Sequence, residues 1–453
     1  MGVQPINLAN LDAKIAECNA APSMMERREL FASFSMDWRP EVADPFSPEY
    51  RTEQMELYRR VAGKRYDLAN EACNFDLSAA TYRPYPYGSH DPETVGVHLV
   101  AIGSLMRQLA SVPAGGRILE FGPGWGNTTL QMALAGFKVT AVDLEEKFCE
   151  LIRRRAIQHK VNINVVNSDF MYAERVTEPY DAVVFFECFH HCDDHMRLLR
   201  AMEKAVKPGG AIFFGGEPIG AAFPIPWGLR LDGEALFAIR NNGWLELGFH
   251  DRYFQDALRS IGWSAVLHKS EETFVANIWE ARRSGEFRVD VSALDPKVGA
   301  IVGEKGPHGI VVEDSNQHWV FCGPFCDLPA GRWLGTVKLD GKVASSGAGI
   351  LQVCYGVPEK VIAQANVTLP AKEMQVRFGT EEAVADVQLR YFSSDLTSFV
   401  MTSIKIEPDE SGLPLDVPAP PQAEEAAPAV DAAPQEAPPR ITPLWRVLSR
   451  VFG

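Results

Sequence analysis

The segment from residue 115 to residue 143 constrains the fold of this chain more than any other. A short apolar strand (118–119) enters a glycine-rich turn (120–126), a helix follows (127–135), and a second strand (138–142) ends on Asp143. A strand, a glycine turn, a helix and a second strand in this order predict the first βαβ unit of a nucleotide-binding α/β sheet.

The glycine turn has a spacing of its own. Gly122, Gly124 and Gly126 alternate along the chain, whereas the dinucleotide-binding turn runs Gly-x-Gly-x-x-Gly. A Cβ at Gly122 or Gly124 would occupy a ligand's space, so glycine lets the backbone come close to one. Asp143 lies about twenty residues on, at a strand tip, where a carboxylate can accept both hydroxyls of a ribose. A turn without a ligand and a dinucleotide-binding turn are the alternatives at this point.

Strands and helices continue to alternate up to residue 283. The run from Tyr180 to Phe186 is continuously apolar after Asp181, as expected of a strand buried on both faces. Lys207-Pro-Gly-Gly210 is predicted to turn into a strand at 211–214. The other predicted elements are helices at 145–159 and 194–205 and strands at 163–166, 263–268 and 273–281.

Together these segments resemble class I S-adenosylmethionine-dependent methyltransferases (type 11/12-like domain) over residues 111–283. The resemblance rests on the turn at 120–126, on Asp169 after the third strand, and on the Lys-Pro-Gly-Gly turn, a frequent mark of that family. It implies an α/β fold with a Rossmann-like sheet of seven strands, the last of them antiparallel. It also implies S-adenosylmethionine as the cofactor.

The same resemblance assigns cofactor-binding roles to residues of this chain. Glu120 and the glycine turn would hold the methionine part of the cofactor, and Asp143 would hold its ribose. Asp169 would accept from the adenine amino group, with Phe170 packing near the ring, although an acid in a turn can also cap a helix. The full predicted set is Glu120, Gly122, Gly124, Gly126, Asp143, Leu144, Ser168, Asp169, Phe170 and Glu187.

Candidates for a catalytic base follow the fourth and fifth strands, because ligands of open α/β sheets bind at the carboxyl ends of the strands. His190 and His191 are the leading candidates, since imidazole titrates near neutrality; packing or cofactor positioning is the alternative role. Glu217 could orient a hydroxyl, act as a base, or serve its loop structurally. His191, Cys192 and His195 could imitate a metal cluster, but no second cluster accompanies them and no metal is predicted.

The remaining regions differ in character from the α/β part. Residues 1–110 are predicted to form a helical region, with helices at 48–62 and 94–109. Within it, the tyrosine- and proline-rich stretch 82–90 is either a lid over the site or simple packing. Residues 285–407 carry short alternating strands and predict an antiparallel β-sandwich. Its segment 323–333 resembles carbohydrate-associated sandwich modules.

The end of the chain is predicted to lack a fold of its own. Residues 408–440 are rich in Pro, Ala and Glu and predict a disordered linker. Residues 441–453 predict a short amphipathic helix that docks onto a protein partner or an anionic membrane surface, or folds back on its own protein.

Composition limits where the chain works and what it binds. The 453 residues carry a net charge of −15, which argues against a nucleic-acid partner. No apolar segment is long enough to span a membrane, and the N-terminus lacks a signal-peptide pattern. The eight scattered cysteines predict reduced thiols, so we expect a cytoplasmic protein, peripheral at the inner membrane face if the tail helix docks there.

These features lead to one main hypothesis: an S-adenosylmethionine-dependent methyltransferase that methylates oxygen on a saccharide or glycan precursor. The saccharide is favoured by the sandwich, by the tethered tail, and by a Trp- and Asn-bearing insertion (223–244) that could stack on a sugar ring. The alternatives are a small metabolite or lipid-like acceptor, and a non-catalytic binding protein. The acids at 120 and 143 argue against a vestigial site.

Overall fold

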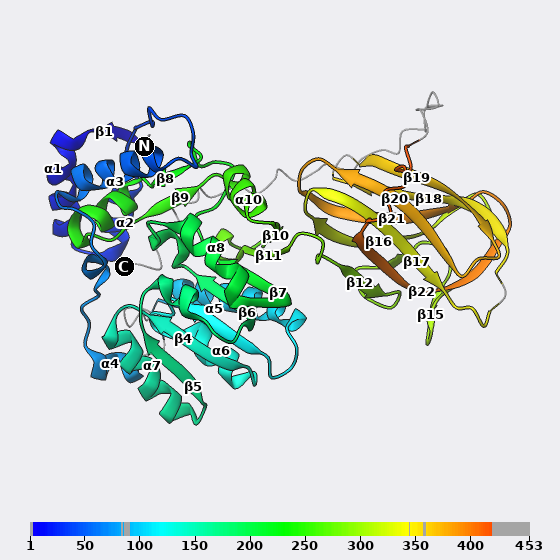
Figure 1. Cartoon of the computed structure of the whole chain (residues 1–453), viewed down its shortest axis with the longest axis horizontal. Coiled ribbons are helices and arrows are strands. Elements are labelled where there is room, and N and C mark those ends of the chain that lie inside the picture. Colours follow the sequence, from blue (N-terminus) through cyan, green and yellow to red (C-terminus); the bar gives the residue numbers. More distant parts are fainter. Residues whose placement is uncertain (1–2, 83–84, 86–90, 344, 357–358, 419–453) are drawn as a thin grey trace. The chain divides into compact units, whose positions relative to one another are not determined.

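The structure is a computed structural model that describes residues 3–82, 85, 91–343, 345–356 and 359–418. The described chain forms two compact units (Figure 1). One extends to Arg282 and the other begins at Arg283, except that Ser264–Val266 group with the second unit. No helix in these described ranges is long and apolar enough to cross a membrane.

A seven-stranded sheet organises the first unit, in the order β10-β11-β7-β6-β3-β4-β5. The strands from β3 to β7 run parallel, and β11 runs antiparallel to β7. The strands are β3 (Arg117–Phe121), β4 (Lys138–Asp143), β5 (Ile163–Asn167), β6 (Tyr180–Phe186), β7 (Val206–Gly215), β10 (Trp263–His268) and β11 (Ile278–Arg283). The predicted Rossmann-like methyltransferase sheet, including its antiparallel last strand, is confirmed.

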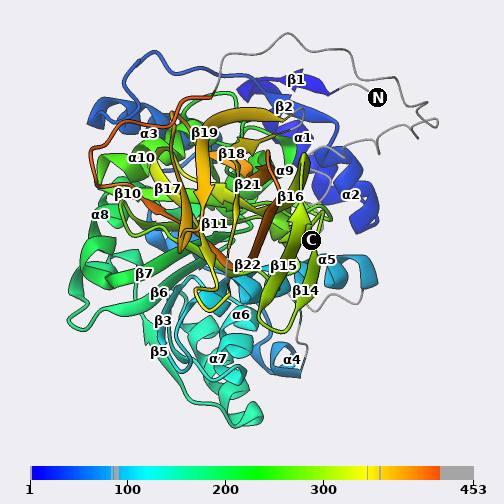
Figure 2. The ribbon, with the colours of Figure 1, turned by 90° about the vertical axis from the view of Figure 1, so that its right-hand side faces the viewer.

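Both faces of this sheet are covered, which explains the unbroken apolar run in β6. Ala182 and Val184 lie in a core shared with the helices α5 and α6, whereas Phe185 stacks with Phe121 and Phe214 of the neighbouring strands. In both views α6 and α7 lie beside β4 and β5 (Figures 1 and 2). The helices of this layer are α5 (Pro92–Gln108), α6 (Asn127–Leu134), α7 (Glu146–His159), α8 (His195–Ala205) and α10 (Asp251–Ser260).

The Lys-Pro-Gly-Gly segment is not the separate turn that the sequence predicted. Strand β7 begins before it, at Val206, and contains it as an irregularity: Tyr180 pairs with Val206, but Ala182 pairs with Ala211. Pro208 has no N–H to donate, and Gly209 has a φ of 75°, so the segment bulges within the strand pairing. The last strand also differs, because a 3₁₀ turn (Phe274–Ala276) delays its start to Ile278.

The N-terminal region is mainly helical and supplies one wall of the site. Its elements are β1 (Gln4–Ile6), α1 (Leu8–Ala20), α2 (Met24–Phe31), β2 (Phe34–Met36), α3 (Pro48–Ala62), the 3₁₀ helix η1 (Leu68–Glu71) and α4 (Leu77–Tyr82). Helix α3 has the predicted bounds because the Ser47 hydroxyl caps its start and Gly63, with a φ of 74°, ends it. Helix α5 starts earlier than expected, after its cap Asp91. Most of the predicted lid (83–84 and 86–90) lies outside the described residues.

An insertion between β7 and α10 packs against α3. It contains an antiparallel hairpin of β8 (Trp227–Leu229) and β9 (Leu247–Phe249). Between these strands lie α9 (Gly233–Phe237) and the π-helical turn η6 (Ala238–Asn242). The Tyr50 hydroxyl of α3 donates to the backbone oxygen of Trp227 at 2.9 Å, which ties the N-terminal region to this insertion.

The second unit is built from two antiparallel sheets around one apolar core. The first has the order β14-β15-β22-β17-β20, with β12 also on β22, and the second has the order β13-β16-β21-β18-β19. The strands are β12 (Val289–Ser292), β13 (Gly299–Ala300), β14 (Glu304–Gly306), β15 (Gly309–Ser315), β16 (His318–Leu328), β17 (Gly331–Leu339), β18 (Gly347–Tyr355), β19 (Lys360–Leu369), β20 (Glu373–Thr380), β21 (Val384–Ser393) and β22 (Thr397–Pro408). The predicted C-terminal antiparallel β region is confirmed.

The first residues of the predicted linker are held on this second unit. Asp409 donates its N–H to the backbone oxygen of Arg332 and accepts from that guanidinium at 3.2 Å. Asp416 donates its N–H to the backbone oxygen of Arg377, and its Oδ2 accepts from the Arg377 N–H at 2.6 Å. The disorder predicted from residue 408 is therefore wrong for this short stretch. Residues 419–453, with the predicted tail helix at 441–453, lie outside the described residues.

Candidate active site

A pocket opens at the carboxyl ends of β3, β4, β5 and β6, with an empty volume of about 1240 Å³ that includes its open mouth. This is the place where ligands of open α/β sheets bind. Its walls combine η1 with residues on either side of it, the glycine turn, the ends of β4 and β5, and the turn after β6. The lining residues are Tyr66, Leu68, Glu71, Cys73, His98, Phe121–Trp125, Asn127, Thr128, Val142–Glu145, Phe148, Ser168–Phe170, Phe186–Cys188, His191 and Trp244.

The three glycines of the turn all have positive φ angles, but for different reasons. A Cβ at Gly122 would lie 2.6 Å from the Cys188 Cβ, and one at Gly126 would lie 2.6 Å from Ile152 Cγ1. A Cβ at Gly124 would meet no atom within 4 Å. Gly122 and Gly126 are thus required by packing within the protein, and Gly124 alone of the three faces open space where a ligand could approach.

Asp143 lies beside Gly124 and is almost fully buried. Its Oδ2 accepts from the Gly124 N–H at 3.0 Å, and its Oδ1 accepts from the Glu145 N–H at 2.9 Å. Burial raises the pKa of Asp143 to about 6, against the lowering effect of these two hydrogen bonds. A carboxylate can accept about four hydrogen bonds, so capacity remains for ribose hydroxyls.

Glu120 lies outside the pocket lining, although the sequence predicted it as a contact of the methionine part. Its carboxylate is fully buried and accepts hydrogen bonds from the hydroxyls of Thr128 and Thr129. Burial raises its pKa to about 7. The contacts seen here tie the first turn of α6 to the end of β3, below the glycine turn.

Four more residues of the predicted cofactor-binding set line the pocket, among them Asp169 and Phe170, which were predicted to contact the adenine. Leu144, Ser168, Asp169 and Phe170 stand at the ends of β4 and β5. Asp169 also caps the following 3₁₀ turn, because its Oδ1 accepts from the Met171 N–H at 3.0 Å. The cap role and the pocket position occur together in this residue.

Glu187 follows β6 and lines the pocket with a strained backbone, at a φ of 53°. Its Oε1 is buried and finds no hydrogen-bond partner among the described residues. Burial raises the pKa of this carboxyl to about 8. A buried acceptor without a partner in the protein is what a ligand's donor would satisfy.

Glu217 does not line the pocket; it builds the turn after β6 instead. Its Oε1 accepts from the backbone N–H groups of Cys188 (2.9 Å) and Phe189 (2.8 Å). Its Oε2 accepts from the His190 N–H (3.1 Å) and lies 2.8 Å from His190 Nδ1. With both oxygens engaged away from the pocket, the geometry gives Glu217 a structural place and not the predicted place beside an acceptor.

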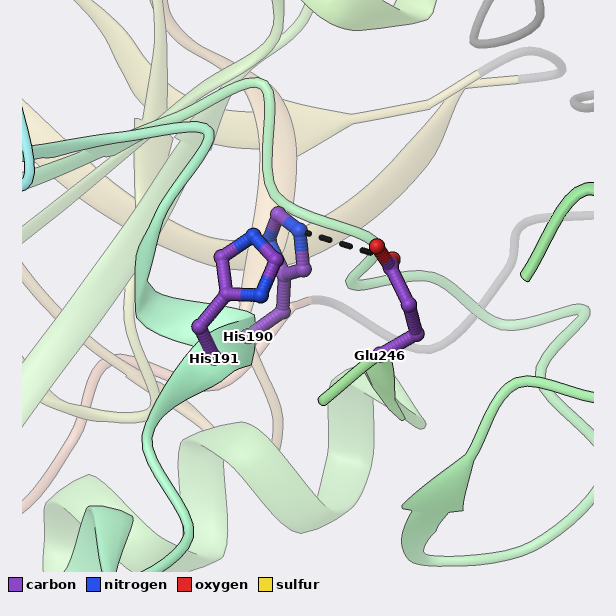
Figure 3. Close-up of side chains that lie close together, drawn as sticks. All are labelled: His190, His191 and Glu246. Carbon is purple, nitrogen blue, oxygen red and sulfur yellow. Dashed lines mark ion pairs between the residues drawn. The ribbon is translucent and has the colours of Figure 1, made fainter. Parts of the chain in front are cut away.

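His190 is buried behind the pocket wall. Its Nε2 has no hydrogen-bond partner among the described residues and lies 3.8 Å from Glu246 Oε2 (Figure 3). Burial lowers the pKa of His190, but the charge and hydrogen bond of Glu217, together with Glu246, outweigh burial and raise it. His190 is therefore placed to carry a charge within the protein and not to meet a ligand.

His191 is the histidine that reaches the pocket. Its Nδ1 lies 2.6 Å from the backbone oxygen of Leu245, and since a carbonyl only accepts, Nδ1 carries the hydrogen. The lone pair of the neutral ring is then on Nε2. Burial and the neighbouring charge of His190 lower the pKa of His191 well below its usual value, so the ring is neutral at physiological pH. A neutral imidazole at a pocket can accept a proton at Nε2, which is the chemistry required of a general base.

Comparison with known proteins agrees with this geometry. A methyltransferase-domain family model matches residues 118–210, which run from β3 into β7. The chain contains a class I methyltransferase domain. S-adenosylmethionine is the methyl donor of this class.

The relatives of this methyltransferase domain are similar over part of their length. An enzyme named ubiquinone biosynthesis O-methyltransferase from Bordetella pertussis is 34% identical over 130 residues, which is 27% of this chain and 54% of the relative. The protein of the same name from Hydrogenovibrio crunogenus is 35% identical over 99 residues, or 21% of this chain and 41% of the relative. The chain thus spans about half the length of the curated relatives it matches.

Solved structures show similar partial matches. An S-adenosylmethionine-dependent methyltransferase from Mesorhizobium loti shares 21% identity and covers 40% of this chain and 98% of its own, with a TM-score of 0.33. The mitomycin 7-O-methyltransferase MmcR shares 16% identity and covers 62% of this chain and 74% of its own, with a TM-score of 0.34. The domain assignment rests on the sequence match and on the sheet order.

The methyltransferase domain also holds a group that could ligate a cation. Ligand atoms of His190, His191 and Glu246 all lie within 4.8 Å of one another. Glu246 Oε2, however, is 3.4 Å from a guanidinium nitrogen of Arg230, and the two histidine Nδ1 atoms are engaged as described above. Because a cation of the protein already faces this carboxylate, we assign no metal to the group. His195, which the sequence analysis grouped with His191 and Cys192 as a possible imitation of a metal cluster, instead has its Nε2 at 2.8 Å from the Tyr253 hydroxyl.

Only one residue of the Trp- and Asn-bearing insertion lines the pocket. Trp244 does so, and its indole Nε1 is buried without a hydrogen-bond partner among the described residues. Trp227 is buried and donates to the Pro45 backbone oxygen at 2.8 Å, so it packs the fold. Asn241 contacts Asn19 at 3.1 Å, away from the lining. Of the insertion that was predicted to stack on a sugar ring, Trp244 is the residue placed to do so.

Among the polar residues of the pocket that sequence reasoning missed, three come from the N-terminal region. These are Tyr66, Glu71 and His98, which lies on α5 and pairs with Asn127 at 3.0 Å. All three lie outside the family match. Element η1 is only four residues long and has no motif, so no pattern in the sequence points to Glu71.

Proposed function

We propose that this chain is an S-adenosylmethionine-dependent O-methyltransferase in which His191 is the general base. The observation that carries the proposal is that a neutral His191 and the Gly124–Asp143 ribose site line one pocket. A site that held the cofactor without transferring its methyl group would have no need of a base there.

The residues present fit the cofactor. Gly124 leaves room for close approach, Asp143 keeps acceptor capacity for the ribose, and Asp169 with Phe170 lines the adenine end. The unpartnered Oε1 of Glu187 suits the ammonium group of the methionine part, because a buried carboxylate is stabilised by an adjacent cation. When bound, the cofactor supplies an electrophilic methyl group on a positively charged sulfur.

The role of His191 follows from its tautomer. The acceptor hydroxyl would give its proton to Nε2 as its oxygen bonds to the methyl carbon and the carbon–sulfur bond breaks, so no free alkoxide forms in the pocket and the sulfur leaves as a neutral thioether. The Leu245 carbonyl keeps the ring oriented through Nδ1. Positioning of the acceptor in line with the methyl group provides most of the remaining rate.

The charge of the lining restricts the acceptor. None of the described lining residues is Lys or Arg, whereas Glu71, Glu145 and Glu187 are all present. Phosphate or carboxylate groups on an acceptor would find no cationic partner there, so the acceptor is neutral or cationic. We propose a neutral saccharide, supported by the flat face and unpartnered N–H of Trp244, which can stack on a sugar ring and donate to a hydroxyl.

A small neutral metabolite such as a phenol is the second candidate. It is favoured by the name of the Bordetella relative, an O-methyltransferase of ubiquinone biosynthesis. The same Trp244 face would stack on an aromatic ring. A methyl-transfer assay with saccharides and with phenols as acceptors distinguishes the two classes.

The test measures cofactor binding and turnover separately. Calorimetry with S-adenosylmethionine should show binding, and Asp143→Ala should weaken it about tenfold or more because a charge-assisted ribose contact is lost. His191→Ala should retain binding and lose methyl transfer. A labelled-methyl assay against neutral saccharides, phenols and sugar phosphates then separates the acceptors. Binding without transfer to any of these, or to fractions of a cell extract, would favour the non-catalytic alternative.

A further inference from the structure

Glu71 is the last residue of η1 and contacts His191, the proposed base. It lies outside the residues that the family model matches. Its Oε2 lies 3.4 Å from His191 Nδ1, and its side chain is 15% exposed. Its Oε1 accepts from the Leu245 N–H at 2.9 Å, while the Leu245 carbonyl takes the His191 Nδ1 hydrogen at 2.6 Å. One residue, Leu245, therefore joins the carboxylate to the imidazole through its N–H and its C=O.

This arrangement acts on both states of the base. In the neutral ring, the Leu245 oxygen and the Glu71 carboxylate both favour the tautomer with hydrogen on Nδ1. Once Nε2 has taken a proton, the ring is a cation, and the charged groups His190 and Arg230 that face it oppose that charge. Glu71 is the carboxylate in contact with the ring and can offset that repulsion.

We propose that Glu71 is a positioning residue for the methyl-transfer reaction: it fixes the tautomer of His191 and stabilises the imidazolium that forms as the acceptor loses its proton. The inference rests on the proposed function, since it assigns a partner to the base named there. It also gives the N-terminal region a role in the chemistry.

The pH dependence of turnover carries a signature of this role. Burial raises the pKa of Glu71 to about 8; Glu246 adds to the rise, and the Tyr66 hydroxyl and Lys64 oppose it. Only the ionised carboxylate stabilises a cation. Turnover should therefore rise as pH increases through about 8, because the ionised fraction of Glu71 grows over that range.

Glu71→Gln is the direct test in the full chain, because it keeps the size of the side chain and removes its charge. We expect kcat to fall about tenfold or more, the rise of kcat near pH 8 to disappear, and the Kd for S-adenosylmethionine to stay within about twofold. Glu178→Gln is the matched control, since that carboxylate is 78% exposed and remote from the lining. An unchanged kcat and an unchanged pH profile in Glu71→Gln would overturn the inference.

If Glu71→Gln is unstable, two further experiments still test the inference. The ¹⁵N spectrum of labelled histidine in the wild-type chain should show His191 with hydrogen on Nδ1, and hydrogen on Nε2 would overturn the inference. His191→Ala separates the two proposals. If His191→Ala keeps full turnover, the proposed function fails; if His191→Ala is inactive while Glu71→Gln is fully active, only the role of Glu71 fails.

Discussion

Two glycines in one turn serve different purposes at the scale of single residues. Gly124 and Gly126 both have positive φ angles, of 49° and 71°, so alanine strains the backbone at either position by about 1 kcal/mol. Only the Cβ at Gly126 would collide with the protein, at Ile152. The same substitution at the two positions therefore separates packing from ligand approach.

We expect Gly126→Ala to lower the free energy of unfolding by about 2–3 kcal/mol, because overpacking against Ile152 adds to the backbone strain. Gly124→Ala should cost only about 1 kcal/mol of stability. It should weaken S-adenosylmethionine binding more than Gly126→Ala does, since its methyl group occupies the open space. Urea unfolding and calorimetric titration of both variants check this pair. Equal loss of binding in the two would contradict the separation.

Elements that a sequence pattern defines were predictable, and elements that long-range contacts define were not. Strand β6 and helix α3 carry their own signals, a continuous apolar run and a capped amphipathic helix. The Lys-Pro-Gly-Gly bulge depends on pairing with β6, so its place inside β7 was missed. In the site, position at or after the end of a strand predicted that Asp143 and His191 lie near a ligand, and both line the pocket. The engagement of Glu120 and Glu217 was not visible, because it depends on hydroxyls and N–H groups that only the fold brings near.

The 3₁₀ turn η5 (Phe189–His191) presents the proposed base, and Glu217 holds the start of this turn through three backbone N–H groups. Glu217→Gln replaces one accepting oxygen with an NH₂ group that faces donors. We expect the free energy of unfolding to fall by about 2–3 kcal/mol, because buried donors lose their partner. Turnover should fall as well, although Glu217 does not line the pocket. Urea unfolding and kcat measure both effects; unchanged stability would show that the turn does not depend on Glu217.

At the scale of the whole molecule, the first unit concentrates buried titratable groups around one pocket. Burial raises the pKa of Asp143 to about 6, of Glu120 to about 7, and of Glu71 and Glu187 to about 8. Burial also lowers the pKa of His98 to about 4 and of His195 to about 3. Composition gave no hint of this, since the net charge of −15 does not distinguish a buried acid from an exposed one.

These shifts predict that stability falls as pH rises from about 5 to 8, because these four carboxyl groups with raised pKa outnumber these two histidines with lowered pKa. Between about pH 4.5 and 8 the folded state holds protons on the buried acids that the unfolded state has released, so stability falls as pH rises through that range. Below about pH 6.5 the unfolded state protonates histidines that the folded state keeps neutral, so their contribution to stability falls as pH decreases. The two trends oppose each other below about pH 6.5, and only the carboxyl effect acts above it. Calorimetric melting should show a Tm that declines from about pH 7 to pH 8.5.

Glu187 provides the specific check on the alkaline side. Glu187→Gln removes one of the acids whose ionisation is penalised, so the decline of Tm between pH 7 and pH 8.5 should become shallower. Saturating S-adenosylmethionine should raise the wild-type Tm more at pH 8.5 than at pH 7, because an ionised Glu187 gains a cationic partner. In Glu187→Gln, saturating S-adenosylmethionine should still raise the Tm, but by the same amount at pH 7 and at pH 8.5. A variant whose Tm declines as steeply as that of the wild type would show that Glu187 is not a source of the alkaline instability.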